Sequence, residues 1–594
     1  MTTPVESAAE IAHLTELLRA TTDRSSSRLF AAAGASRHHL SPARANLLRH
    51  LELEGLSILE LGGGCGGLSR FLAEKASRFV SLEPRPAQRE ALAARLSGLE
   101  QAAIAEGSEG LAGAGFDLVV VVEDSDGDTS ERLEARLRMA KDSLRPGGLV
   151  ALAGGNRLGL GAFAGQPDRN SRTYFEGLAG GDQPGDPLSR REWRRLIADA
   201  ALEVKAEFLL SPDVWLPTCV LREELLEHDL ELATDLLCHL PFDDPTLPAF
   251  PLLPPSLLAE SLARGGLLAD LAPGFLWLLG GAGSGDLFSK LSGETREPEL
   301  AWHYAAERVP ATRTRFFLRG ERLWVAKEAF TLAPPRPLLR WSASPEQPVL
   351  RGQRWRQRLI RSGYFEQGDF EEKLGGLLGQ LRRSFAAGPD RLEGRALDAI
   401  FHNAIFCEDG ETRLFDLEWE LEGDLPTSWW VLRNVLALAP NLETIGRGVG
   451  AENLGELYHR LCGALGVSAQ LDQDLDAEAR LQAELGGQTA ESIRPAIAAL
   501  LRRPLASSAT PPRFPEDLGG WQDKQERLRG ELETLRAGFA AVVRMADDLR
   551  WLGDKVSELS AAQDQQQAAM RSQYESLVSI DGALRWLAGK IDRP

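Results

Sequence analysis

The sequence has 594 residues, of which 43% are hydrophobic and 26% charged, and its formal net charge is −19 at pH 7. This length predicts several domains, and the composition is that of a globular protein. An acidic chain without a basic block is a poor electrostatic match for nucleic acid or anionic lipid. We therefore expect neither of them as a direct partner.

Features that direct a chain out of the cytoplasm or into a membrane are not expected. The five cysteines are scattered without C-x-x-C spacing, which argues against a disulfide framework or a zinc site and fits a reducing compartment. Residues 1–14 have neither a basic n-region nor an apolar h-region, and the most apolar stretch, about 252–282, is broken by charged residues and a proline. We expect a cytoplasmic protein without a transmembrane segment, which meets the inner membrane only through partners.

The first part of the chain predicts helices and then an alternation of strands and helices. Residues 6–50 contain IAHLTELLRA, which has helical spacing, and Ser41-Pro42, a typical helix start. From 56 to 153, short apolar runs alternate with helical patterns. This alternation predicts a parallel sheet covered by helices on both faces, with its ligand outside the carboxyl ends of the strands.

A glycine-rich turn follows the first apolar run, SILEL at 57–61. Glycines let the backbone turn sharply and approach a ligand closely, and a helical pattern begins directly after them. Glu83 ends the next apolar run, about twenty residues further on, where an acid can hydrogen-bond a ribose diol. The turn is either an ordinary strand–helix connection or a nucleoside site; its spacing is not the clean G-x-G-x-x-G of NAD binding.

The pattern E-x-G-x-G-x-G in this turn resembles motif I of class I S-adenosylmethionine (SAM)-dependent methyltransferases, and the resemblance covers about residues 40–225. It implies a Rossmann-like α/β domain over 1–225, with SAM as cofactor. FDLVVVV (116–122) and LRPGGLVALA (144–153) resemble the fourth and fifth strands of that family. By the same resemblance, the cofactor-binding residues are Glu60, Gly62, Gly64 and Gly66 in the turn, Glu83 at the ribose and Glu106 near the adenine.

The segment 154–181 is glycine-rich, polar and too long for a simple connection, and loops of this kind are often functional. It resembles a loop in methyltransferases encoded among polysaccharide-biosynthesis genes, from which Gly155 and Arg169-Asn170 depart. The segment is either a surface lid or the acceptor side of the site. The acceptor-side candidates are Asn156, Arg157, Asp168 and Tyr174. Residues 187–221 are expected to close the same fold, and 226–300 to form a helical connector.

The period of the hydrophobic pattern changes over 301–330. There HYAAER, TRTRFFLR and RLWVAKEAF alternate like strands, with a tight turn at Arg319-Gly320. Lys327 follows Val-Ala, as the lysine does in the V-A-I-K strand of kinases. Asp398 and Asn403 have the D-x-x-x-x-N spacing of a kinase catalytic loop, and Asp416 stands in D-L-E where kinases have D-F-G.

This ordered set resembles the kinase-like fold of small-molecule and sugar kinases and predicts an α+β domain over 301–505. The resemblance implies that Lys327 contacts ATP, that Asp398 is the catalytic base, and that Asn403 and Asp416 hold Mg²⁺. A glycine cluster over the phosphates is missing, and about twenty residues between Lys327 and the expected hinge at 349–355 leave no room for an ordinary αC helix. An active kinase, a degenerate kinase-like module and an unrelated α+β domain all remain open.

The end of the chain predicts a linker and a coiled coil. Residues 506–520 are rich in proline and serine, as linkers are. Apolar residues over 521–594 recur at heptad spacing around a glutamine-rich middle. The heptads predict a coiled coil that forms homo-oligomers or docks a partner; the alternative is one amphipathic helix folded back on the body.

The order of methyltransferase, kinase-like domain and coiled coil resembles that of the bifunctional methyltransferase–kinase proteins that terminate O-antigen polysaccharides. This resemblance implies a glycan or lipid-linked glycan substrate, ATP and Mg²⁺ beside SAM, and a glycosyltransferase partner bound through the coiled coil. The alternative is a non-enzymatic scaffold, in which an inactive kinase-like body and the coiled tail organise a glycan-assembly complex.

Overall fold

The structure is a computed structural model, and its described residues belong to one compact unit, residues 1–511. These residues are 8–21, 37–123, 129–165, 178, 187–238, 255–281, 283–293, 297–332, 336, 339–342, 344–365, 368–441, 445, 448–486 and 489–505. The predicted linker and coiled coil lie outside the described residues, so both stay predictions.

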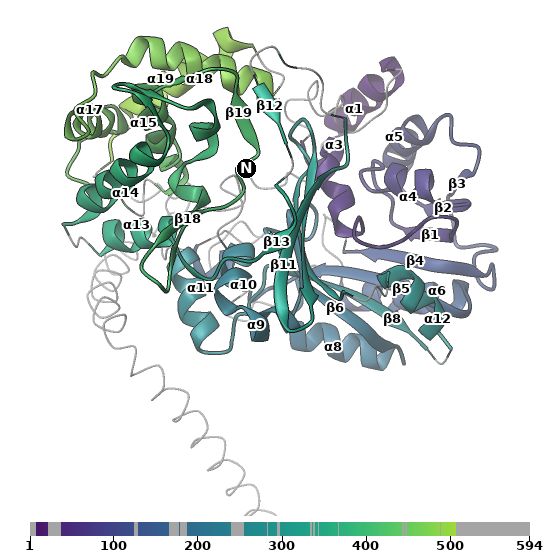
Figure 1. Ribbon diagram of the computed structural model, residues 1–594. Coiled ribbons are helices and arrows are strands. Elements are labelled where there is room, and N and C mark those ends of the chain that lie inside the picture. Colours follow the sequence, from purple (N-terminus) through teal and green to yellow (C-terminus); the bar gives the residue numbers. More distant parts are fainter. Residues whose placement is uncertain are drawn as a thin grey trace, which may run out of the picture. The chain divides into compact units, whose positions relative to one another are not determined.

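The first half of this unit is built on a parallel sheet in the order β3-β2-β1-β4-β5 (Figure 1). Its strands are β1 (Ser57–Leu61), β2 (Arg78–Leu82), β3 (Ala102–Ala105), β4 (Phe116–Val122) and β5 (Leu144–Gly155), all paired in parallel. The predicted Rossmann-like alternation is therefore confirmed for these strands. The strand order reverses between β1 and β4, and a crevice at such a reversal is where ligands of open α/β sheets bind.

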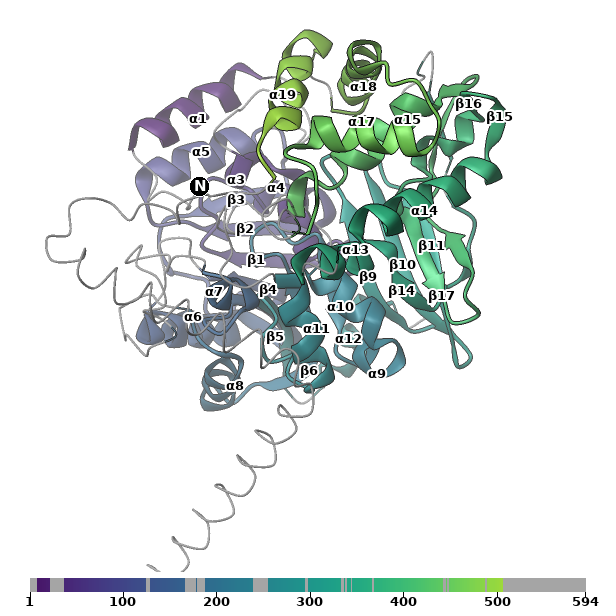
Figure 2. The same cartoon turned by 90° about the vertical axis from the view of Figure 1, so that its left-hand side faces the viewer.

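The central strands are apolar throughout because both faces of the sheet are covered. In β4, Leu118 and Val120 belong to the core on one face, and Val119 and Val121 to the core on the other. The covering helices include α4 (Ser69–Lys75), α5 (Pro86–Leu96) and α6 (Ser130–Ser143). The predicted first helix is α1 (Ala8–Ala20), which lies beside α5 in both ribbon views (Figures 1 and 2).

Three antiparallel strands continue the sheet beyond β5. They are β8 (Gly274–Gly280), β6 (Glu203–Ser211) and β7 (Cys219–Arg222), in that spatial order. The prediction of a purely helical connector over 226–300 is therefore wrong at β8, which inserts between β5 and β6 and is buried along its whole length. Periodicity cannot separate a short, fully buried strand from a buried helix, because GFLWLLG is apolar on every side.

The helices of this region are α9 (Glu224–His228), α10 (Leu230–Cys238), α11 (Pro255–Arg264) and α12 (Gly285–Ser292), and residues 239–254 lie outside the described residues. In the described part of the chain, no helix is long and apolar enough to cross a membrane.

The strands predicted over 301–330 are β9 (Glu299–Ala305), β10 (Thr312–Arg319) and β11 (Arg322–Ala329), with Gly320 at a positive φ in the tight turn. They are antiparallel to one another, and β9 pairs with β7. A single twelve-stranded sheet thus runs from the parallel half into this region. The expected boundary at residue 301 falls inside β9, and the sheet continues across it.

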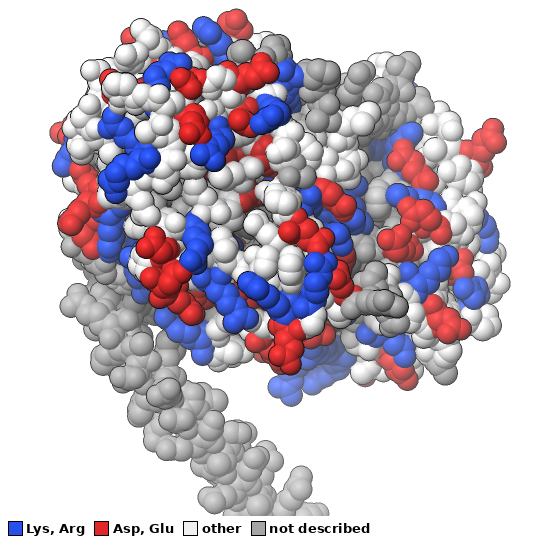
Figure 3. Space-filling view, viewed as in Figure 1, with Lys and Arg blue, Asp and Glu red and all other residues white. Residues whose placement is uncertain are grey.

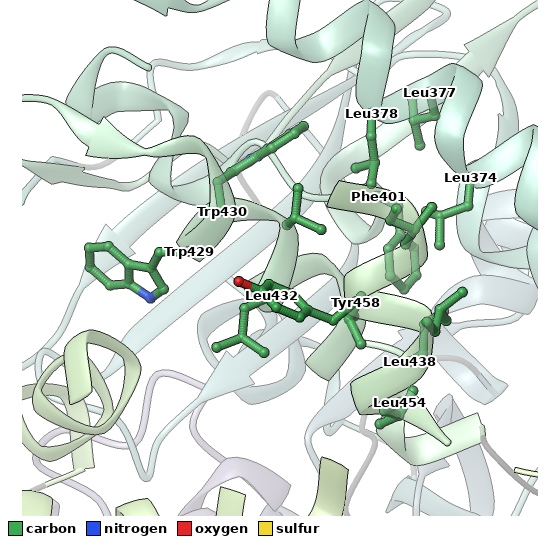
Figure 4. Close-up of a cluster of buried hydrophobic side chains, with 14 of the residues drawn as sticks. Leu374, Leu377, Leu378, Phe401, Trp429, Trp430, Leu432, Leu438, Leu454 and Tyr458 are labelled. Carbon is green, nitrogen blue, oxygen red and sulfur yellow. The ribbon is translucent and has the colours of Figure 1, made fainter. Parts of the chain in front are cut away.

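Helices and short strands form the remaining part of the unit. The helices are α13 (Trp355–Tyr364), α14 (Phe370–Ser384), α15 (Thr427–Leu436), α17 (Leu454–Ala464), α18 (Leu471–Gly486) and α19 (Ala490–Arg502). Their core is shown in Figure 4, where Trp430 and Leu432 come from α15, Tyr458 from α17 and Leu378 from α14. A hairpin of β17 (Ala404–Cys407) and β18 (Thr412–Leu414) ends just before Asp416.

Candidate functional site

The glycine turn lies at the carboxyl end of β1, beside the reversal of strand order. Gly62 has φ +86° and Gly64 has φ +54°, a region that glycine occupies without strain. A Cβ on Gly62 would lie 3.2 Å from Nη2 of Arg136, whereas a Cβ on Gly64 would meet nothing within 4 Å. Gly64 therefore presents open backbone at the carboxyl end of β1, as a residue that approaches a ligand must.

Glu60, the predicted motif acid, holds the base of this turn. It is buried, and its Oε2 accepts hydrogen bonds from Ser69 Oγ at 2.5 Å and Ser81 Oγ at 2.9 Å. Burial raises the pKa of the Glu60 carboxyl, and the two hydroxyl donors oppose that shift. Because these bonds connect β1 with α4 and β2, Glu60 shapes the turn.

Glu83 lies directly after β2 and faces the turn, as predicted. Its Oε2 accepts the Gly64 N–H at 2.7 Å. The same carboxylate is bound by Arg85, whose Nε lies 2.8 Å from Oε1 and whose Nη2 lies 3.1 Å from Oε2. The side chain of Glu83 is fully buried, whereas that of Arg85 is 32% exposed. A ribose diol would therefore reach Glu83 only after the Arg85 guanidinium moved outward.

Arg136 of α6 is a site residue that the sequence did not indicate. Its Nη2 donates to the carbonyl oxygens of Leu61 at 2.7 Å and Val122 at 2.8 Å, which end β1 and β4. The guanidinium therefore lies across the two strand ends at which the strand order reverses. Nothing distinguishes Arg136 from the other arginines of the same helical pattern, so its role could not be predicted.

Glu123 is a second residue that sequence reasoning missed. It follows β4 directly and is 3% exposed, and its Oε2 accepts the Gly155 N–H at 2.7 Å. The sequence could have indicated Glu123, because this residue is the first acid after an apolar strand, and ligands of such sheets bind at the carboxyl ends of the strands. Glu106 follows β3 at the same edge, is 76% exposed and pairs with Arg89 at 3.3 Å.

The acceptor-side candidates are not brought together in the described residues. Asn156 Nδ2 donates to the carbonyl oxygens of Asp270 and Ala272, both at 2.8 Å, and Arg157 Nη2 lies 2.7 Å from Glu192 Oε1. Both side chains therefore anchor the end of β5 to neighbouring segments, and their acceptor role stays a prediction. Asp168 and Tyr174 lie outside the described residues.

The kinase-like candidates do come together, in a cavity of about 800 Å³. Lys327 of β11, Asp398 at the end of a 3₁₀ turn (Gly394–Asp398), Asn403 of a second turn (Phe401–Asn403) and Asp416 all line it. Another wall comes from the first half of the unit, including Asp213 and Thr218. Lys327 and Asp416, which are 89 positions apart, thus share one site.

Lys327 is paired with two carboxylates. Its Nζ lies 2.7 and 2.9 Å from the two Asp416 oxygens and 2.8 Å from Glu418 Oε2. Burial alone would lower the pKa of Lys327, but the charges of Asp416 and Glu418 outweigh it and raise that pKa. Burial alone would raise the pKa of Asp416, but the charge and the hydrogen bond of Lys327 outweigh it and lower that pKa. Lysine and aspartate are therefore both charged at neutral pH.

Asp398 and Asn403 are held by backbone groups around this pair. Asp398 Oδ2 accepts the N–H groups of Glu418 at 3.1 Å and Trp419 at 2.6 Å, and burial raises its pKa to about 6. Asn403 Nδ2 donates to the Asp398 carbonyl oxygen at 2.9 Å. Among the described residues, no group of three or more His, Cys, Asp or Glu is arranged to hold a metal ion. The predicted metal ligands therefore stay a prediction.

No protein-family model and no curated protein matches this chain. Solved structures that resemble it include a SAM-dependent methyltransferase of Leishmania major, with 14% identity over 46% of this chain and 83% of that one at a TM-score of 0.24. N-methyltransferase NodS of Bradyrhizobium japonicum, in complex with S-adenosyl-L-homocysteine, is 16% identical. The match covers 33% of this chain and 88% of NodS, with a TM-score of 0.23. A SAM-dependent methyltransferase of Mesorhizobium loti is 16% identical. The match covers 40% of this chain and 98% of that one, with a TM-score of 0.24. Likenesses this distant carry no inference about what this chain binds.

Proposed function

We propose that the first half of the chain is a SAM-dependent methyltransferase. The observation that supports this most is the 2.7 Å hydrogen bond from the Gly64 amide to Glu83, at the carboxyl edge beside the reversal of strand order. An acid there is suited to the ribose diol of a nucleoside, and the open face of Gly64 is suited to its close approach.

The residues at this edge are compatible with SAM on one condition. Glu83 would hold the ribose once Arg85 had moved outward, and the turn 62–66 would lie along the nucleoside. The cofactor would supply an electrophilic methyl group. The protein's part is to hold donor and acceptor in line, because methyl transfer depends on positioning more than on acid–base help.

Substitution at Gly64 tests the donor site. In Gly64→Gln a side chain enters the open space at the crevice, so titration calorimetry should show SAM binding lost or weakened at least tenfold, about 1.4 kcal/mol. Gly293→Gln is the matched control, since Gly293 has nearly the same φ, +55°, at the end of α12. Equal SAM affinity in Gly64→Gln and the wild type would remove the proposed site.

The acceptor that we propose is a glycan or phosphoglycan of cell-surface polysaccharide synthesis. Only the resemblance in domain order supports this choice. Transfer of labelled methyl from SAM to a panel of lipid-linked glycans, with and without ATP, would test it. Methylation that requires ATP would indicate that a phosphate made by the second half is the acceptor.

A second candidate function is phosphoryl transfer from a Mg²⁺–nucleoside triphosphate in the 800 Å³ cavity. Its support is the convergence of Lys327, Asp398, Asn403 and Asp416 there. Electrostatic stabilisation by a lysine and metal-bound carboxylates is the main requirement of that chemistry. Mg²⁺-dependent ATP turnover that disappears in Asp416→Ala would support it. ATP binding without turnover would favour a degenerate module, and no ATP binding would remove the nucleotide site.

The non-enzymatic alternative is a scaffold that acts through its predicted coiled coil. Deletion of residues 516–594 should then abolish self-association and capture of a glycosyltransferase while SAM binding persists. Light scattering and co-purification would measure both. Oligomers that survive the deletion would eliminate this alternative.

A further inference from the structure

We propose that Glu418 is the positioning residue for Lys327, which it keeps in the cavity when a Mg²⁺–nucleoside triphosphate engages Asp416. This inference rests on the second candidate function above. Glu418, two residues after Asp416, is then the buried acid that pairs with the phosphate-binding lysine.

The two carboxylates on Lys327 differ in depth. The side chains of Lys327 and Glu418 are 6% and 8% exposed, whereas that of Asp416 is 39% exposed. Asp416 therefore lies on the open side of the pair, where a cation can reach it, and Glu418 lies on the closed side. A ligand that takes Asp416 leaves the bond between Lys327 and Glu418 in place.

Glu418 is fixed from three directions. Its Oε2 accepts Trp341 Nε1 at 3.1 Å besides Lys327 Nζ at 2.8 Å, and its own N–H donates to Asp398 Oδ2 at 3.1 Å. One residue thus joins β11, β12 (Leu339–Trp341) and the turn that carries Asp398. The separation of Lys327 and Asp398 depends directly on it.

In the described part of the chain, Lys327 pairs with no acid besides Asp416 and Glu418, so this task falls to Glu418. The described residues between β11 and α13 form only the short strands β12, β13 (Gln347–Pro348) and β14 (Gly352–Arg354). A helix that could bring a glutamate to Lys327 from the outside is absent from these described residues. A buried ammonium that loses its partner is costly, so a lysine that must release Asp416 needs a second carboxylate.

Ionisation of Lys327 gives a test that needs no ligand. In protein with ¹³C-labelled lysine, the Lys327 side-chain signal is assigned by its loss in Lys327→Arg and titrated against pH. Glu418→Gln keeps the shape of the side chain and removes its charge, so the pKa of Lys327 should fall. Glu420→Gln is the matched control, since Glu420 lies only two residues after Glu418 but pairs with Arg340 at the surface. That control should leave the titration unchanged.

The other ionisable groups around the pair do not confuse this titration. His303 of β9, Arg308 of the following turn and Asp398 complete the charged surroundings. Burial, with a smaller contribution from Lys327, lowers the pKa of His303 to about 4, so this ring stays neutral over the range in which Lys327 titrates.

Affinity for Mg²⁺–ATP provides the second measurement. Calorimetry at neutral pH should show about tenfold weaker binding in Glu418→Gln than in the wild type, and unchanged binding in Glu420→Gln. This loss of affinity should increase as pH rises, because the Lys327 ammonium of the variant deprotonates at a lower pH than that of the wild type. A Lys327 titration and an ATP affinity that both match the wild type would overturn the role of Glu418. If the wild type bound no Mg²⁺–ATP, the nucleotide site itself would fail, while the Lys327 titration would still decide whether Glu418 positions the lysine.

Discussion

The guanidinium of Arg85 binds both carboxylate oxygens of Glu83, through Nε at 2.8 Å and Nη2 at 3.1 Å. Glu83 is fully buried beneath it and also accepts the Gly64 N–H. An ion pair thus covers the acid proposed to bind ribose. Arg85 is the more exposed partner, so it can rotate into water at little cost.

Removal of Arg85 should therefore strengthen SAM binding. Arg85→Ala leaves Glu83 without its competing donor, and the ribose hydroxyls then satisfy a buried carboxylate; we expect about fivefold tighter binding, or roughly 1 kcal/mol. Glu83→Gln should weaken binding by at least that much. Calorimetric titration with SAM measures both.

Arg89→Ala is the control for this pair, because Arg89 of α5 bonds the backbone oxygens of Glu83 and Pro84 and pairs with the exposed Glu106, but does not contact the Glu83 carboxylate. It should change SAM affinity little. Weaker binding in Arg85→Ala would show instead that the guanidinium is part of the cofactor site.

Arg136 should contribute to stability through the carbonyl oxygens of Leu61 and Val122. Arg136→Ala leaves these acceptors at the crevice without their donor, and we expect a loss of about 1–3 kcal/mol in the free energy of unfolding, measured by urea denaturation. Arg138→Ala, two residues further along α6 and with a 70% exposed side chain, should cost less than about 0.5 kcal/mol. Equal losses in the two variants would contradict the proposed contact.

Asp398 should make stability depend on pH. Burial raises its folded-state pKa to about 6 from the ordinary value of 3.8, so the folded protein binds the proton more tightly than the unfolded chain does. Its contribution is therefore fully present below about pH 4 and decreases as pH rises to about 6, by up to roughly 3 kcal/mol.

Urea midpoints measured from pH 4 to pH 7 would show this dependence. The difference between the wild type and Asp398→Asn should change across that range, because asparagine does not titrate. A constant difference would show that the pKa of Asp398 is not raised. If Asp398 is also the base of a phosphoryl transfer, that activity should decrease as pH falls below about 6.

Gly394, which opens the turn leading to Asp398, should not tolerate a side chain. A Cβ there would lie 1.9 Å from the carbonyl oxygen of Leu421, so Gly394→Ala must displace β19 (Trp419–Leu421) or the turn. We expect a loss of more than about 2 kcal/mol. Gly376→Ala is the control on α14, where a Cβ meets nothing within 4 Å and alanine should stabilise the helix by about 0.5–1 kcal/mol. Thermal unfolding measures both, and a neutral Gly394→Ala would contradict the close approach.

Charge on the surface agrees with the expectation drawn from composition. On the face shown in Figure 3, lysine and arginine side chains are interspersed with aspartate and glutamate, without a broad basic area. A mixed surface of this kind offers little attraction to a polyanion. The absence of nucleic acid among the partners nevertheless stays a prediction.

The sequence by itself determined the parallel strands, the glycine turn and the position of Glu83 at its edge. Each of these is encoded locally, by apolar runs, by residues that tolerate positive φ and by a short spacing along the chain. The set of Lys327, Asp398, Asn403 and Asp416 was also predictable, because it follows an ordered pattern of motifs.

Only the tertiary structure decided that β8 inserts between β5 and β6, that Arg136 bridges two strand ends, and that Glu418 shares Lys327 with Asp416. It also showed Asn156 anchoring a turn where an acceptor contact had been expected. These features join residues that are distant in the chain. Packing and the pairing of buried charges select such contacts, and no local periodicity records which distant partner is chosen.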